Sequence, residues 1–105
     1  MASGQAKAET LSLDCSINGE ILTNVWVDTD KSTVTTHSKG SPGSNTFPAQ
    51  ITISSISWSV DFSRGKAISS IDRTTGILTP LVHPDLNYYP QQCVKGTTPL
   101  PATKF

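Results

Sequence analysis

The amino-acid sequence predicts an all-β domain: a small antiparallel meander of about six to eight short strands that forms a closed or nearly closed barrel. Two observations predict it. Apolar residues recur at every second position in several short segments, and turn-forming residues separate these segments. After the first nine residues, no segment has the apolar spacing of an amphipathic helix. A two-sheet β-sandwich is the alternative arrangement.

The composition of the chain fits one small domain. Its 105 residues are enough for a single modest core, and eight Lys and Arg balance eight Asp and Glu. This balance gives no electrostatic reason to expect a nucleic-acid partner. No apolar run approaches the roughly 20 residues of a membrane-spanning helix, so no membrane span is expected. We expect a disordered tail over 1–10, a β-domain over 11–96 and an extended tail over 97–105.

The first half of the domain alternates apolar and polar residues in three segments. Cys15 falls on the inward face of the first, and Trp26 lies opposite its two valine neighbours in the second, where we expect it to be partly exposed. Asn18-Gly19 is typical of a two-residue hairpin turn, but the poor alternation over 20–23 leaves the length of this turn open. The predicted strands cover residues 11–17, 24–28 and 33–37.

A long segment rich in glycine and proline follows, with the sequence SKGSPGSNTFP over 38–48. It holds two glycines and two prolines, so we predict a loop that cannot stay in a strand ladder for long. Phe47 is expected to anchor this loop on the core. The loop is either a plain connector between hairpins or a binding element, such as the rigid loop of an inhibitor-like protein.

The second half of the domain begins with a change of parity. Isoleucines stand at odd positions 51 and 53, whereas the apolar residues of 56–62 stand at even ones, so a turn, bend or bulge is required at Ser54-Ser55. Asp72 and Gly76 are expected to anchor and close a turn, and Pro80 to break a strand. The predicted strands cover 50–53, 56–62, 67–71 and 77–79, with a last strand around 92–94 beside the first.

The two cysteines, Cys15 and Cys93, lie near opposite ends of the predicted domain. A disulfide between them closes a loop of nearly the whole domain, which restrains the unfolded chain and stabilises the fold by about 4 kcal/mol. The alternative is two buried free thiols in a reducing compartment. We favour the disulfide, and with it a periplasmic or secreted protein whose signal peptide lies outside this sequence.

No catalytic or metal-binding motif is recognisable in the sequence. His37 and His83 lie far apart, and neither has a Cys or His at ligand spacing. No G-x-S-x-G segment marks a serine nucleophile, and the glycines around Pro42 lack the lysine that ends a phosphate loop. We therefore expect a protein that is not an enzyme and uses no cofactor.

Several side chains are candidates for a binding surface, because exposed aromatic residues and arginine are enriched at interaction hot spots. Each has a structural alternative. The tyrosines can cover one end of the barrel, and Asp72 can cap its turn while Arg73 stays in solvent. The shared parity of Trp58 and Phe62 indicates core residues instead. The candidates are Trp26, Phe47, Arg73, Tyr88 and Tyr89.

A set of short pieces spread over residues 11–93 carries a resemblance. The pieces are Leu13-Asp14-Cys15 with Gly19, the hairpin around Val27-Asp28, Ile56-Ser57-Trp58, the segment IDRTTG over 71–76, and Cys93. Together they resemble small exported bacterial proteins of unknown function. The resemblance implies a compact all-β fold and assigns no activity.

These observations favour a non-enzymatic exported domain that binds a protein partner, in the manner of an inhibitor or otherwise, or a small ligand. We expect it to be a monomer. The alternative is a structural component of a cell-envelope or surface assembly.

Overall fold

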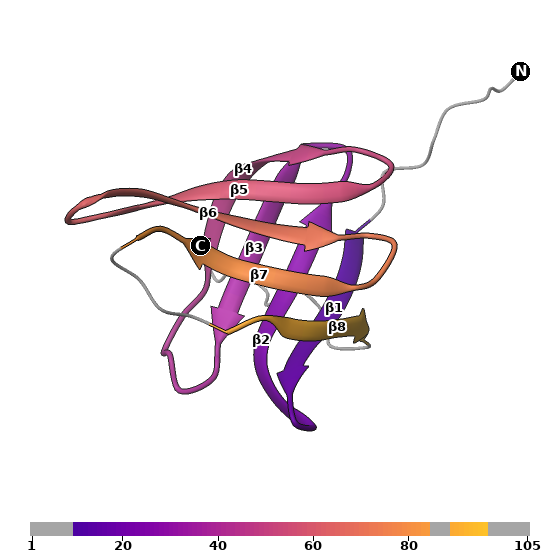
Figure 1. Cartoon of the computed structure of the whole chain (residues 1–105). Coiled ribbons are helices and arrows are strands. Elements are labelled where there is room, and N and C mark those ends of the chain that lie inside the picture. The colour runs from indigo at the N-terminus through magenta and orange to yellow at the C-terminus, as the bar shows by residue number, and fades with distance from the viewer. Residues whose placement is uncertain (1–9, 85–88, 97–105) are drawn as a thin grey trace, which may run out of the picture.

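The computed structural model describes residues 10–84 and 89–96, which form a closed antiparallel barrel of eight strands (Figure 1). Each strand pairs with the next along the chain, and the last pairs with the first. This confirms the predicted meander and favours the barrel over the sandwich. The described residues contain no helix that is long and apolar enough to cross a membrane. The strands are β1 (Thr10–Ile17), β2 (Glu20–Asp28), β3 (Thr33–Ser38), β4 (Asn45–Ile51), β5 (Ser55–Phe62), β6 (Gly65–Asp72), β7 (Ile77–Val82) and β8 (Gln91–Lys95).

The barrel interior is filled by side chains that follow the alternation of the strands. Trp58 is buried there, as predicted. The prediction that Phe62 is a core residue is wrong: it is half-buried at the end of β5, with its ring edge-on to His83 and the ring centroids 4.7 Å apart. Each buried branched side chain contributes roughly 1.5–3 kcal/mol through loss of apolar surface to water. The buried cluster consists of Cys15, Val25, Val27, Val34, Ile56, Trp58, Ile71, Leu78 and Cys93.

The first hairpin turns through two residues. Asn18 and Gly19 both have positive φ, 53° and 84°, which is the pattern of a type I′ turn. The register then shifts, because Ser16 pairs with Ile21 but Cys15 pairs with Thr23. The residue left over is a bulge, and it explains the poor alternation over 20–23. Strand β2 therefore begins at residue 20, four residues earlier than predicted.

The glycine- and proline-rich loop is shorter than predicted. Ser38 belongs to β3 and residues 45–48 belong to β4, so only 39–44 lie between the two strands. Pro48 stands in the ladder opposite Thr33. The next residue, Ala49, donates its N–H to the carbonyl of Ser32 at 2.9 Å. Because backbone groups alternate along a strand, the nitrogen of Pro48 points away from β3, so the missing N–H removes no hydrogen bond between β3 and β4. The prediction that Phe47 packs against the core is confirmed.

The change of parity occurs in a turn over 52–54. The hydroxyl of Thr52 accepts hydrogen bonds from the N–H groups of Ser54 and Ser55, at 3.2 and 3.0 Å. Ile53 is 94% exposed at the tip of this turn, so the predicted strand over 50–53 is wrong in its last residues. The required break is real, but it begins two residues before Ser54.

The turn between β6 and β7 has the predicted chemistry. The carboxylate of Asp72 accepts the N–H groups of Thr74 and Thr75, at 2.8 and 3.2 Å, and Gly76 has a φ of 79°. A side chain at Gly76 has no room, because an added Cβ lies 2.7 Å from the carbonyl oxygen of Cys93. The turn is therefore part of the packing against β8.

Strand β7 continues through Pro80, where we predicted a break. The register shifts between Ile68 and Ser70 on the partner strand, and Leu81 has a positive φ of 49°. A proline is tolerated at such an irregularity because the ladder is already interrupted. The N–H of Leu81 donates to the buried hydroxyl of Ser69 at 3.0 Å, which replaces a backbone partner.

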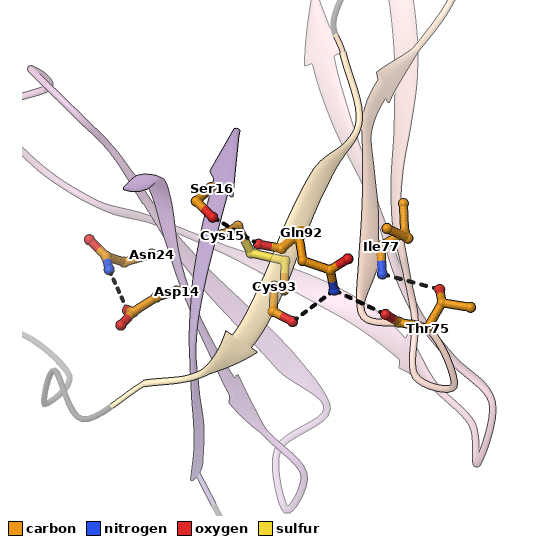
Figure 2. Close-up of a disulfide and its surroundings, with 8 residues drawn as sticks. All are labelled: Asp14, Cys15, Ser16, Asn24, Thr75, Ile77, Gln92 and Cys93. Atoms are coloured by element: carbon orange, nitrogen blue, oxygen red, sulfur yellow. Dashed lines mark hydrogen bonds between the residues drawn. A yellow bond between two sulfur atoms is a disulfide. The ribbon is translucent and has the colours of Figure 1, made fainter. Parts of the chain in front are cut away.

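The barrel closes between β1 and β8, and a disulfide joins Cys15 to Cys93 across this closure (Figure 2). The predicted last strand beside the first is thus confirmed. Gln92 adds a link to the other neighbour, because its side-chain amide donates to the carbonyl of Thr75 at 3.0 Å. These contacts fix the short strand β8 between β1 and β7.

Candidate functional site

The barrel wall opens between β4 and β5. Only three residue pairs join these strands, although both strands continue well beyond the pairing: Ala49 with Trp58, Gln50 with Ser57 and Ile51 with Ile56. Pro48 lies directly after the last pair and, by the alternation of the ladder, its nitrogen faces β5. Since proline has no N–H to donate, the ladder ends there and the strands separate.

A groove of about 950 Å³ occupies this opening. Its floor is apolar, because Phe47, Trp58 and Val60 turn their side chains to the barrel interior and pack with the core. Its rim is polar and comes mainly from the outward positions of the same two strands. The lining residues are Asn45, Phe47, Pro48, Ala49, Gln50, Ser57, Trp58, Ser59, Val60, Asp61, Lys66 and Ile68.

Strand β5 presents an unpaired edge to the groove. Ser57 pairs with Gln50, and the N–H of Thr52 donates to the carbonyl of Ser55 at 2.8 Å, so odd-numbered residues of β5 direct their backbone groups toward β4. Beyond Trp58 the N–H and C=O groups of Ser59 and Asp61 therefore point into the groove. No strand of the described chain pairs with this edge beyond Trp58.

The far end of the groove lies on the β5–β6 hairpin, which projects beyond the rest of the barrel (Figure 1). Asp61 and Lys66 pair across this hairpin at 2.7 Å, and both side chains are exposed. On the outer face of β6, Ile68 is 44% exposed and pairs with the exposed Val82 of β7. An exposed apolar pair, Ile68 and Val82, therefore lies beside the rim of the groove on the outer face of the barrel.

The predicted surface residues do not come together in one place. Trp26 is only 3% exposed, which contradicts its expected partial exposure. Its neighbours Val25 and Val27 belong to the core cluster and Trp26 does not, so Trp26 is on the other face of β2 and is buried all the same. Phe47 lies in the floor of the groove, Arg73 is exposed in the β6–β7 turn, and Tyr89 is 68% exposed before β8. Tyr88 lies outside the described residues.

The polar residues considered for chemistry have structural contacts. The ring Nε2 of His37 lies 3.1 Å from the carbonyl oxygen of Ser41, and His83 packs on Phe62. Asp28 caps the β2–β3 turn by accepting the N–H groups of Asp30 and Lys31. Over the described ranges, no three His, Cys, Asp or Glu residues gather as a metal would need.

Comparison with known proteins gives no relative. No family model matches the chain, and neither the curated proteins nor the solved structures contain a match. The resemblance to small exported bacterial proteins therefore stays a prediction.

Sequence reasoning missed the groove although it singled out Phe47. The available signal was Pro48. It directly precedes Ala49, which pairs with Trp58 of β5 and donates its N–H to the carbonyl of Ser32 beside β3. The sequence pattern predicts a loop over 38–48, and a proline in a loop marks no strand edge.

Proposed function

We propose that this protein is a non-enzymatic, exported binding domain that takes up an extended segment of a protein partner in the groove between β4 and β5. The observation that carries the proposal is the unpaired edge of β5 at Ser59 and Asp61 above an apolar floor. Main-chain hydrogen bonds to an added strand supply affinity, and pockets for alternate side chains supply specificity. A partner segment with apolar residues at every second position meets both requirements.

Export is supported by the disulfide between Cys15 and Cys93, which is compatible with an oxidising compartment. Alkylation of the protein in intact source cells, followed by fractionation and mass spectrometry, tests this part. Unlabelled cysteines in the periplasmic fraction or the medium support export, and two labelled cysteines in the cytosolic fraction contradict it.

Binding is tested by selecting phage-displayed random peptides on the immobilised protein. We expect the selected peptides to alternate apolar and polar residues. Ser59→Pro removes an N–H that points into the groove and leaves the ladder to β6 intact, so it should weaken these peptides at least tenfold. Ser59→Ala keeps the N–H and is the matched control, with affinity equal to the wild type.

Two results contradict the proposed binding mode. One is equal peptide affinity for Ser59→Pro and Ser59→Ala, with circular dichroism showing that both variants are folded. The other is a selection without any enriched peptide.

The same exposed edge favours a second function, a structural component of a surface assembly. An unpaired strand edge also pairs with the corresponding edge of another copy, and the exposed Ile68 and Val82 lie beside it. Sedimentation velocity over a wide range of protein concentration separates the two functions. A monomer throughout favours the binding domain, whereas assembly that Ser59→Pro abolishes favours the structural role.

A further inference from the structure

A second hollow, of about 250 Å³, lies at the end of the barrel opposite the β5–β6 turn, where the described chain begins at Thr10 and ends at Gly96. At this end of the barrel, β8 is no longer paired with β7. The last link between them is the N–H of Cys93 donating to the carbonyl of Gly76 at 2.8 Å, and the following Lys95 pairs only with Leu13 of β1. The barrel wall therefore has a notch between β8 and the β6–β7 turn.

The inner walls of the notch are apolar and come from three strands. Ile56 and Ile71 are register partners on β5 and β6, and each is 2% exposed. Leu11 and Leu13 of β1 are half-buried and pack against the same core. An apolar group that enters the notch is thus removed from water on several sides.

The mouth of the notch carries two cationic side chains, Arg73 and Lys95. One guanidinium nitrogen of Arg73 donates to the carbonyl of Thr52 in the β4–β5 turn at 2.7 Å, which restrains the side chain. No carboxylate among the described residues pairs with Lys95. The acidic residue that lines the notch is Asp72, whose carboxylate accepts two N–H groups of its own turn, so the notch has two cations against one carboxylate.

We propose that the notch is a binding site for a small amphipathic anion, a free carboxylic acid with a short acyl or aryl body. The body lies on the half-buried side chains of Leu11 and Leu13, and the carboxylate faces Lys95 and Arg73. The charge of the mouth disfavours an amphipathic cation and leaves a neutral analogue without an ionic partner. The volume lies just below the roughly 300 Å³ of the smallest ligand pockets, which fits a short chain better than a long-chain lipid. The site is independent of the β4–β5 groove and lies at the other end of the barrel.

Octanoate, kept below its micelle-forming concentration, is a suitable probe. In a titration followed by two-dimensional ¹H–¹⁵N NMR of the whole protein, we expect saturable shifts at the amides of Leu13, Ile71 and Lys95, and none at Ser59. Lys95→Glu replaces attraction with repulsion at an exposed position and should weaken octanoate about tenfold. Lys39→Glu, in the exposed β3–β4 loop and outside both hollows, is the matched control with unchanged affinity.

Octanol and octylammonium complete the experiment. Octanol should bind more weakly than octanoate and be insensitive to Lys95→Glu, and octylammonium should cause no saturable shift around the notch. The proposal is overturned if octanoate leaves these amides unshifted, if its shifts lie along the β4–β5 groove, or if Lys95→Glu binds octanoate as tightly as Lys39→Glu does.

Discussion

Cys15 and Cys93 lie directly opposite each other in the antiparallel pair of β1 and β8, with their Cα atoms 3.9 Å apart. Both side chains belong to the buried core, at 0% and 6% exposure. They are 78 residues apart in the chain, and they join the one strand pair of the described barrel that is not formed by consecutive strands. The covalent bond therefore holds the closure of the barrel.

Loss of this bond should lower the stability of the domain markedly. Replacing both cysteines by alanine removes the restraint on the unfolded chain, and we expect the free energy of unfolding to fall by about 4 kcal/mol. Urea denaturation followed by tryptophan fluorescence measures the difference. Wild-type protein unfolded in the presence of reductant serves as the control and should match the variant. An unchanged urea midpoint would show that the bond contributes nothing.

Gly76→Ala should be far more costly than Gly40→Ala. Both glycines have positive φ, 79° and 84°, so alanine is strained at each by roughly 1 kcal/mol. Only at Gly76 does the added Cβ meet the backbone, 2.7 Å from the carbonyl oxygen of Cys93, whereas nothing lies within 4 Å at Gly40. We expect Gly76→Ala to lose about 2 kcal/mol more than Gly40→Ala in thermal unfolding. Equal losses would mean that the turn does not pack against β8 as described.

The hydroxyl of Ser69 should matter more than that of its neighbour. Ser69→Ala leaves the N–H of Leu81 without its acceptor in a half-buried bulge, and we expect a loss of about 1–2 kcal/mol. Ser70→Ala is the control, because Ser70 lies on the outward face of the same strand, and its cost should stay within about 0.5 kcal/mol. Hydrogen exchange adds a local test: the amide of Leu81 should lose protection in Ser69→Ala alone.

Two nearby isoleucines should differ in how much stability the same substitution costs. Ile51 packs against the core, so Ile51→Ser should destabilise the domain by about 2 kcal/mol. Ile53 is 94% exposed, so Ile53→Ser should be neutral within about 0.5 kcal/mol and should improve solubility. Differential scanning calorimetry of both variants decides between this turn and the strand over 50–53 that the sequence pattern favours.

Alternation and turn chemistry predicted most of the barrel, because both act locally. The predicted strand over Ile56–Phe62 is confirmed, and so is the turn over Asp72–Gly76, in which the Asp72 carboxylate accepts backbone N–H groups. The errors occur where one residue interrupts a ladder. The bulge after Glu20 weakened the alternation of β2, and the bulge at Leu81 allowed β7 to pass through Pro80. An extra residue in a strand leaves no mark in composition.

The candidate site was much less predictable than the fold. A groove between two strands depends on where their pairing stops, and Phe47 gave only one wall of it. The notch needs Arg73 and Lys95 to lie at one mouth, although 22 positions separate them in the sequence. The prediction that Trp26 is partly exposed is wrong for a related reason, since burial of an outward side chain depends on contacts between elements and not on strand parity.

The strand order has a consequence for how the chain reaches its folded state. Seven pairings join consecutive strands and need only short loops to close, whereas the pairing of β1 with β8 must wait for the end of the domain. A chain that emerges N-terminus first therefore has an unpaired edge on β1, and Cys15 as a free thiol, until Gln91–Lys95 is available. During that interval a neighbouring nascent chain can pair with the edge of β1 or with the thiol of Cys15 in place of β8. Rapid oxidation before β8 is available would therefore link two molecules instead of closing one barrel.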